Sequence, residues 1–389
     1  AHVEQITDLA CRHALTYRGV SHITFPSDLQ AEEPAEDTLS RHNVWHHTSS
    51  RTAAPGGTPP EQDLARAAEV LNACERVAIL AGRGALGATD LLIQAAERLQ
   101  APIAKALLGK AAVPDDHPLT TGTIGILGTR PSKEAMERCD GLLVVGSSFP
   151  YMEYLPKPGQ ARGVQIDLDP ARIALRYPVE VGLVGDAVRT LEALLPLLRQ
   201  KEESGYLREI QSSMGEWRRL IEKRGTLPDR PLKPQVVAYE LGRQAAEDAV
   251  VACDSGSNTT WWAQQFPVKR GQAHSVSGGM ASMGCALPYA AAAQLAYPGR
   301  QCLAIAGDGG FSMLMVELLT CVKYSLPVKV FVLKNDTLAQ IKWEQMAFLG
   351  NPEYGCDLQP MDYAAFATAC GATGLTLTDP ADCAGVVEE

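Results

Sequence analysis

The feature that most constrains this chain is a Gly307-Asp308-Gly309-Gly310 turn between two apolar segments. These segments predict strands over Gln301–Ala306 and Val328–Leu333, and the apolar period between them predicts a helix over Met313–Tyr324. A strand, a helix and a strand of these lengths form a βαβ unit, whose two strands run parallel. The turn and Asn335 then both follow the carboxyl ends of strands, where open α/β sheets bind ligands.

The residue types at these two strand ends favour a particular ligand. Asp308 and Asn335 offer a carboxylate and an amide oxygen, which suit Mg²⁺ bridging to phosphate oxygens. The glycines let the backbone approach a phosphate closely, and the N-terminus of the following helix favours its negative charge. The motif therefore predicts a magnesium-diphosphate site, with an ordinary strand-to-helix turn as the alternative.

Composition narrows the class of protein. The 389 residues, 46% hydrophobic and 21% charged, are those of a globular chain with two or three domains. The net charge of -10 disfavours nucleic acid as a partner, and no segment approaches the roughly 20 apolar residues of a membrane span. Ten cysteines without a Cys-x-x-Cys pair predict reduced thiols and a cytoplasmic location, with attachment to the inner face of the membrane as an alternative.

Alternating helical and strand patterns predict an α/β fold with two parallel-sheet domains and the tail of a third. The predicted segments are the remnant of an N-terminal domain (1–30), a linker (31–60), a central domain (61–200), a second linker (201–233) and a C-terminal domain (234–389). The remnant holds a predicted helix over Val3–Tyr17 and a predicted strand over Val20–Phe25. Two such elements cannot close a core, so we expect most of that domain to be absent from this chain.

Two other turns of the C-terminal domain carry candidate ligand contacts. Asp254-Ser255-Gly256-Ser257-Asn258 follows a predicted strand and reads either as a phosphate-binding turn or as ordinary N-capping of the next helix. The run Ser277–Gly284 is rich in small residues, which would let a planar ring approach the backbone with a larger apolar side chain beneath it. Its alternative is a tightly packed helix start in which methionine fills a gap.

Together these motifs resemble the thiamine diphosphate enzymes, and most closely pyruvate oxidase, quinone-dependent pyruvate dehydrogenase and acetolactate synthase. By this resemblance, Asp308, Asn335 and Thr337 would bind Mg²⁺, and Met283 would hold the cofactor in a bent form. The residues that the resemblance assigns to thiamine diphosphate are Ser257, Asn258, Ala281, Ser282, Met283, Asp308, Gly309, Gly310, Asn335 and Thr337.

The central domain carries two competing nucleotide signals. Gly82–Gly87 matches the dinucleotide fingerprint Gly-x-Gly-x-x-Gly, but the next predicted strand ends at Lys105-Ala106 without the acidic residue that NAD binding needs. The domain instead resembles the FAD-binding domain of pyruvate oxidases, although several relatives keep this domain without FAD. The residues that this resemblance assigns to FAD are Thr121, Gly122, Thr123, Ile124, Ser147, Ser148, Phe149, Pro150, Tyr151 and Asp167.

The resemblance implies oxidative decarboxylation of pyruvate or another small 2-ketoacid, with electrons passing through FAD to quinone or O₂, in a homodimer or homotetramer. Acetolactate synthase-type carboligation, non-oxidative 2-ketoacid decarboxylation, an NAD-dependent dehydrogenase and a non-catalytic subunit are the alternatives. The family's catalytic glutamate lies in the N-terminal domain, so no catalytic residue is assigned in this chain. We therefore expect the chain by itself to be inactive.

Overall fold

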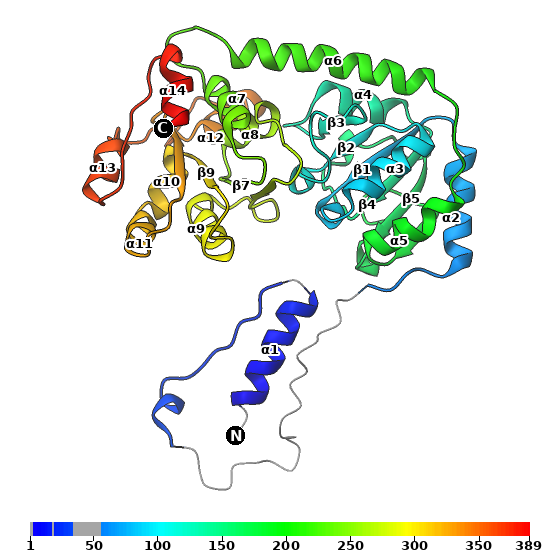
Figure 1. Ribbon diagram of the computed structural model, residues 1–389, viewed down its shortest axis with the longest axis horizontal. Coiled ribbons are helices and arrows are strands. Elements are labelled where there is room, and N and C mark those ends of the chain that lie inside the picture. The colour runs from blue at the N-terminus through cyan, green and yellow to red at the C-terminus, as the bar shows by residue number, and fades with distance from the viewer. Residues whose placement is uncertain (1–2, 18, 34–55) are drawn as a thin grey trace. The chain divides into compact units, whose positions relative to one another are not determined.

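The computed structural model describes residues 3–17, 19–33 and 56–389, which belong to two units, Ala1–Gly57 and Thr58–Glu389 (Figure 1). In the first unit, helix α1 spans Val3–Tyr17 as predicted, and a short 3₁₀ turn, η1, spans Leu29–Ala31. The predicted strand over Val20–Phe25 is wrong, because the described residues of this unit offer no neighbouring strand to pair its backbone. Most of the predicted linker, 31–60, lies outside the described residues.

The second unit begins with a six-stranded sheet in which every strand is parallel to its neighbours. Its strands are β1 Val77–Ala81, β2 Ile103–Lys105, β3 Thr120–Thr123, β4 Gly141–Val145, β5 Arg162–Asp167 and β6 Val181–Val184. The order across the sheet is β3-β2-β1-β4-β5-β6. The chain therefore reverses its direction of travel across the sheet between β1 and β4, which is the topological switch point of such a fold.

Helices cover both faces of this sheet, because alternate strand residues point to opposite sides. In β1, Val77, Ile79 and Ala81 pack into one apolar core with three of the helices, and Ala78 and Leu80 pack into another core on the opposite face. The helices of the first core are α2 Glu61–Ala73, α3 Thr89–Leu99 and α5 Ala187–Leu194, and α4 Arg130–Arg138 belongs to the second. The result is a three-layer α/β domain.

A second all-parallel sheet, of four strands, forms the C-terminal part of the same unit. Its strands are β7 Val250–Cys253, β8 Ala273–Val276, β9 Cys302–Gly307 and β10 Lys329–Leu333, in the order β10-β9-β7-β8. The predicted parallel pairing of the strands on either side of the Gly-Asp-Gly turn is confirmed, since Leu333 pairs with Gly307 in the β9–β10 ladder. Both strands consequently end at the same edge of the sheet.

The helices around this sheet are mostly short. They are α7 Pro234–Gln244, α8 Ser257–Gln265, α9 Ala286–Ala296, α10 Asp308–Leu314, α11 Glu317–Lys323, α12 Ala339–Trp343, α13 Tyr363–Ala369 and α14 Cys383–Glu388. The single helix predicted over Met313–Tyr324 is wrong in its bounds. The N–H groups of Leu318 and Leu319 bond to carbonyls three residues earlier, and this tighter turn separates α10 from α11.

Short 3₁₀ turns and one π-helical turn complete the second unit. The 3₁₀ turns are η2 Arg83–Ala85, η3 Leu107–Gly109, η4 Met152–Tyr154, η5 Pro170–Arg172, η6 Leu195–Leu197 and η8 Pro380–Asp382, and the wider π-helical turn is η7 Glu344–Phe348. A long helix, α6 Gly205–Gly225, lies within the predicted linker 201–233 and begins where the Ser204 hydroxyl accepts the N–H of Leu207. Figure 1 shows α6 running past both sheets, and it contacts α4 on one and α7 on the other. Its buried face, which includes Ile210, therefore joins the two sheets.

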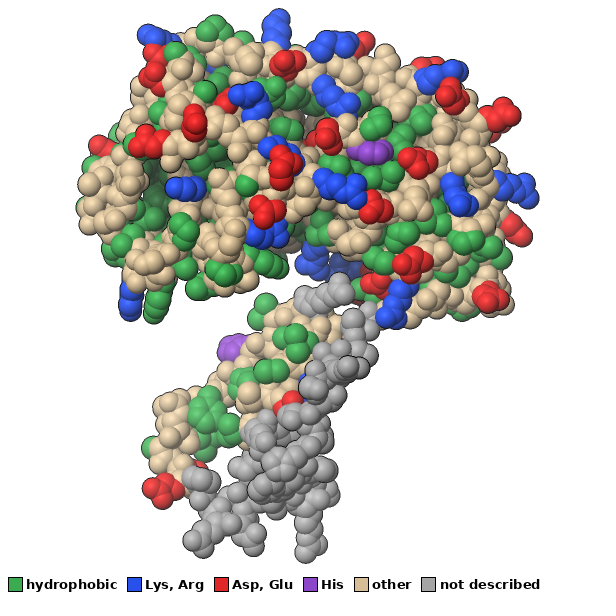
Figure 2. Space-filling model, viewed as in Figure 1, with side chains coloured by type: hydrophobic (Ala, Val, Ile, Leu, Met, Phe, Trp, Pro, Cys, Tyr) green, Lys and Arg blue, Asp and Glu red, His purple; other side chains and the backbone are tan. Residues whose placement is uncertain are grey.

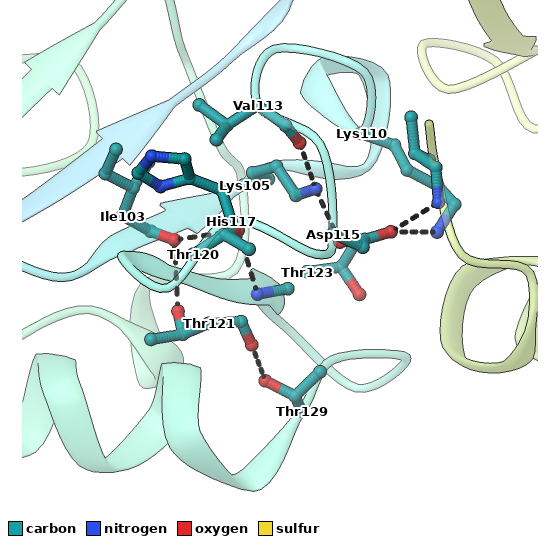
Figure 3. Close-up of polar contacts among 12 residues, drawn as sticks. Ile103, Lys105, Lys110, Val113, Asp115, His117, Thr120, Thr121, Thr123 and Thr129 are labelled. Atoms are coloured by element: carbon teal, nitrogen blue, oxygen red, sulfur yellow. Dashed lines mark hydrogen bonds and ion pairs between the residues drawn. The ribbon is translucent and has the colours of Figure 1, made fainter. Parts of the chain in front are cut away.

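A buried ionic cluster also joins the two sheets (Figure 3). Asp115 accepts the N–H of Val268 at 2.9 Å with its side chain and donates its own N–H to the Val268 carbonyl. Lys105, at the end of β2, donates to Asp115 at 2.6 Å, while Lys110 lies 3.6 Å from the other carboxylate oxygen and donates to the carbonyl of Ala263 in α8. The cluster thus ties the central sheet to the helix and loop that flank β8.

Candidate functional site

The predicted metal ligands meet at the carboxyl ends of β9 and β10. The Asp308 carboxylate is almost fully buried and accepts the N–H of Asn335 at 2.9 Å and the N–H of Asp336 at 2.6 Å on one oxygen. Its other oxygen accepts the N–H of Gly309 at 2.9 Å. Asp336 has a φ of 55°, a left-handed conformation that aspartate tolerates better than most residues. One side chain therefore fastens the two turns that the sequence predicts to hold a metal.

The next residues of the second turn supply further oxygens. The Asn335 amide oxygen accepts the N–H of Thr337 at 3.1 Å, and the Thr337 hydroxyl donates to the carbonyl of Cys356 at 3.1 Å. The Thr337 carbonyl, which was predicted as the third metal ligand, accepts the N–H of Ala339. A carbonyl oxygen has two lone pairs, so this bond leaves one available to a cation.

The small-residue run also reaches the metal turn. A Cβ atom at Gly309 would lie 2.8 Å from Leu338 Cδ2 and 3.5 Å from Met283 Cε, so the Met283 side chain reaches the metal turn. Met280, three residues earlier, is 86% exposed. Ala281 and Ser282 are exposed, and Ala281 takes a left-handed φ of 51°. The sequence-predicted turn and the metal site thus meet through Met283.

The third predicted contact segment lies at the end of β7. Asn258 is buried, with its amide nitrogen donating to the carbonyl of Asp254 at 2.7 Å and its amide oxygen 3.3 Å from the place of a Cβ atom at Gly307. Ser257 is the first residue of α8 and is half-buried. Gly256 has a φ of 134°, which only glycine adopts readily, so the turn can be made without strain. The Asn258 amide nitrogen is therefore already engaged within the turn.

In the central sheet, the switch point between β1 and β4 brings two glycine turns together. Gly84 donates its N–H to the carbonyl of Gly146 at 3.0 Å, and a side chain at Gly82 would overlap Gly146 and Ser147. This close approach of two backbones at the ends of parallel strands is the setting in which α/β sheets bind nucleotides. Arg172 donates to the Ser148 hydroxyl at 3.1 Å at the same edge.

The predicted flavin segments share this edge. The Phe149 ring lies 3.1 Å from the place of a Cβ atom at Gly125, so the segment after β4 meets the segment after β3, and Phe149 also packs edge-on against Tyr151. Pro150 and Tyr151 are exposed, Gly122 and Ile124 are buried, and Asp167 ends β5 and accepts the N–H of Asp169 at 3.0 Å.

Two hydroxyl groups among the predicted flavin contacts already form hydrogen bonds within the chain. Thr121 bonds to Ser132 at 2.8 Å and Thr123 donates to the carbonyl of Leu127 at 3.4 Å (Figure 3 shows the neighbouring threonines). These two side chains therefore stabilise the turn between β3 and α4. The residue that the sequence left without a role, Lys105, occupies the strand end where NAD-binding domains carry an acid, and its ammonium group is buried against Asp115.

Comparison with known protein families identifies the family of this chain. Residues 64–194 match the model described as thiamine pyrophosphate enzyme, central domain, and residues 254–389 match thiamine pyrophosphate enzyme, C-terminal TPP binding domain. The chain belongs to the thiamine pyrophosphate enzyme family. Thiamine pyrophosphate is another name for thiamine diphosphate, so the family predicted from the sequence is confirmed, together with its two parallel-sheet α/β domains.

Individual relatives in this enzyme family cover most of the chain. It is 41% identical to the Bacillus subtilis (strain 168) protein YdaP, which carries the name of a thiamine pyrophosphate-containing protein, over 99% of this chain and 66% of that one. It is 30% identical to pyruvate oxidase of Lactiplantibacillus plantarum, over 94% of this chain and 60% of the relative, and 30% identical to acetolactate synthase isozyme 3 large subunit of Escherichia coli, over 87% and 60%. The chain thus spans between 60% and 66% of the length of these relatives.

The donor atoms fit the magnesium ion that thiamine pyrophosphate enzymes use. Asp308, Asn335 and Thr337 offer a carboxylate, an amide and a carbonyl oxygen, a set that suits Mg²⁺ and not a thiophilic metal. Among the described residues, no three or more His, Cys, Asp or Glu side chains gather as a metal cluster. A single carboxylate is enough here, because Mg²⁺ takes its remaining ligands from phosphate oxygens and water.

Among the described residues, no helix is long and apolar enough to cross a bilayer.

Proposed function

We propose that this chain forms the central and C-terminal parts of a thiamine diphosphate- and Mg²⁺-dependent enzyme that decarboxylates pyruvate oxidatively and contains FAD. The observation that carries the proposal is the hydrogen bond that joins the Asp308 carboxylate to Asn335, with Met283 beside the same turn. A carboxylate, an amide oxygen and an apolar wedge gathered at the ends of parallel strands are what a diphosphate cofactor with a planar ring requires.

Each residue then has a stated role. Asp308, Asn335 and Thr337 would hold Mg²⁺ against the diphosphate, while Ser257 at the start of α8, with Asn258, would face the phosphate oxygens. Ala281, Ser282 and Met283 would orient the rings through the backbone and the Met283 side chain, and Gly309 and Gly310 leave room for the phosphates. The bound cofactor supplies the electron sink for decarboxylation, and the chain supplies position and electrostatics.

The FAD part of the proposal is supported by the switch point of the central sheet. The contact of Gly84 with Gly146 leaves no side chain between the two turns, and Ser147, Ser148 and Asp167 stand at the same edge. Serine hydroxyls suit phosphate oxygens, and a carboxylate at a strand end suits the hydroxyl pair of a ribose. The pyruvate oxidase relative, 30% identical, favours the same assignment.

A carboligase of the acetolactate synthase type is the second candidate, because a relative of that name is also 30% identical over 87% of the chain. Both candidates would use the same metal turn and the same central sheet. They differ in whether a second 2-ketoacid or an electron acceptor, quinone or O₂, takes the activated fragment. A simple 2-ketoacid decarboxylase, which uses neither, is the third.

We propose a homodimer or homotetramer from the apolar surface of the C-terminal domain. Leu295 in α9, Met313 in α10, Val316 between α10 and α11, and Leu319 in α11 are each more than half exposed. Figure 2 shows hydrophobic side chains over this part of the surface, and apolar patches of this kind mark interaction sites. Cytoplasmic location remains part of the proposal, supported by ten cysteines that are all free thiols in this structure.

The test is an absorption spectrum of the intact protein as its own cell produces it, followed by pyruvate with thiamine diphosphate and Mg²⁺ in the absence of air. A flavin spectrum that bleaches with pyruvate supports an oxidase or quinone-linked dehydrogenase. A flavin that stays oxidised while pyruvate is consumed, with acetolactate as the product, supports the carboligase instead. A protein without flavin would overturn the FAD assignment.

A further inference from the structure

Asp254 is a buried carboxylate to which neither candidate site assigns a role. It follows β7, its residue is 0% exposed, and its backbone N–H bonds to the carbonyl of Ile305 in β9. Its side chain takes part in no ion pair among the described residues, and its partners there are N–H groups and the Cys285 thiol. Burying a carboxylate is unfavourable unless hydrogen bonds compensate it, so these partners are what hold it there.

The partners of this carboxylate belong to the Met283 turn. One oxygen accepts the N–H of Gly284 at 2.9 Å, and the other accepts the N–H of Cys285 at 3.1 Å and that of Ser255 at 3.0 Å. Gly284 and Cys285 directly follow Met283, and Gly284 has a φ of 85°. Asp254 therefore fixes the C-terminal end of the turn that carries Met283.

The same carboxylate also touches the metal turn. A Cβ atom at Gly310 would overlap the Asp254 carboxylate, so the two groups are in direct contact. The Asp254 carbonyl in turn accepts the Thr259 hydroxyl at 2.6 Å and the Asn258 amide at 2.7 Å, which hold the start of α8. Three turns that are far apart in the sequence, after β7, before α9 and after β9, meet on one residue.

We propose that Asp254 is a positioning residue of the thiamine diphosphate site, which sets the Met283 turn against the Asp308 turn without touching the cofactor itself. The inference rests on the proposed function. An ionised carboxylate only accepts hydrogen bonds, and both of its oxygens face N–H donors. Asparagine has the same shape, but its amide group would point N–H at one of those donors, so Asp254→Asn should loosen the Met283 turn while keeping the packing.

The experiment compares two probes of the same site in the complete chain, both with saturating Mg²⁺: thiamine diphosphate and inorganic diphosphate. Inorganic diphosphate would use the metal turn and the start of α8, whereas thiamine diphosphate would also need the Met283 turn. We expect Asp254→Asn to weaken thiamine diphosphate binding at least tenfold and inorganic diphosphate binding less than threefold. Thr259→Val is the matched control, since it removes a hydrogen bond to the Asp254 carbonyl and leaves the Met283 turn bonded.

A second variant reaches the same turn from its own side, in case Asp254→Asn does not fold. Gly284→Ala has room for the added methyl, whose nearest neighbour is Met313 Cβ at 3.4 Å, but its left-handed φ strains any other residue. It should produce the same difference between the two probes. Equal losses for both probes, or no loss, would overturn the role of Asp254. A wild-type chain that binds neither probe would instead overturn the proposed function on which the role depends.

Discussion

The carboxylate of Asp308 accepts the backbone N–H of Asn335 at 2.9 Å, so one predicted metal ligand holds the other in place. The bond joins the ends of β9 and β10, which are neighbours in the sheet although they are far apart in sequence. Among the described residues, the second carboxylate oxygen accepts the N–H of Gly309 alone, which leaves a lone pair for a cation. Asp308 thus has both a structural role in the turn and a proposed ligand role.

We expect Asp308→Ala to weaken Mg²⁺-dependent binding of thiamine diphosphate at least tenfold, which is about 1.4 kcal/mol. The loss follows from removal of the carboxylate ligand and of the bonds that order Asn335. Asp336→Asn is the matched control, because it keeps an amino acid that tolerates a positive φ and loses only an exposed pair with Lys334. Titration calorimetry measures both. Unchanged thiamine diphosphate binding in Asp308→Ala would refute the metal assignment.

The Met283 turn allows a paired test within four residues. Met283→Ala removes the side chain that reaches Gly309, so we expect lower affinity for thiamine diphosphate, by about tenfold, in a chain that still folds. Met280→Ala removes the same side chain type at a position that is 86% exposed, and its affinity should stay at the wild-type value. Equal affinities in the two variants would show that Met283 does not contact the cofactor.

Much of this fold could be predicted from local sequence because fully buried parallel strands read as continuous apolar runs. β9 and β10 lie within one residue of the strands predicted over Gln301–Ala306 and Val328–Leu333, and the strand predicted before Asp254 is β7. β3 was not predicted as a strand, because Thr120–Thr123 is polar. In the folded chain its hydroxyl groups form hydrogen bonds within the sheet, such as that of Thr121 to the Ile103 carbonyl.

The sequence identified individual residues of the candidate site, but not the contacts between them. The strand ends identified Asp308 and Asn335, but no sequence spacing indicates that Asp254 would hold the turn at Gly284, because that contact depends on the order of β7 and β9 in the sheet. The ion pair of Lys105 with Asp115 was missed for a related reason. Asp115 also bonds to the loop at Val268, which is distant from Lys105 and Asp115 in sequence, so no local pattern indicates the cluster.

We expect the buried cluster around Asp115 to contribute much more to the free energy of unfolding than an exposed ion pair between the same two sheets. Burial by itself would raise the pKa of Asp115, but the charges of Lys105 and Lys110 outweigh it and lower this pKa to about 2. Asp115→Asn would leave two buried ammonium groups uncompensated, and we expect a loss of about 3–5 kcal/mol in the free energy of unfolding.

The control for that variant is Asp90→Asn, which breaks the pair of Asp90 with Arg270 between the same two sheets. Both side chains are well exposed, at 68% and 63%, so the expected loss is about 0–1 kcal/mol. Urea denaturation of the chain and the two variants measures the difference. Similar losses for both would mean that the buried cluster adds nothing to the contact between the sheets.

His274 gives the prediction with the clearest pH dependence. The ring is buried and its Nδ1 accepts the indole N–H of Trp262 at 3.0 Å, so the ring is neutral and its Nε2 donates to Gln272 at 3.1 Å. Burial first, and then the charge of Lys110, lower the pKa of His274 well below its ordinary value of 6.5, with Lys105 adding to this effect and Asp115 opposing it. A proton on Nδ1 would break the bond to Trp262.

The sign of the effect follows from proton binding. Below pH 6.5 the unfolded chain protonates His274 and the folded chain does not, so the unfolded state binds more protons and stability falls as the pH falls. Well above pH 6.5 both states are neutral and the contribution is complete. The slope should approach about 1.4 kcal/mol per pH unit between pH 6 and 5. His274→Gln keeps an acceptor for the Trp262 indole without a titrating group, so urea midpoints of this variant should fall less over the same range. Parallel pH profiles of the wild-type chain and His274→Gln would show that His274 does not control acid stability.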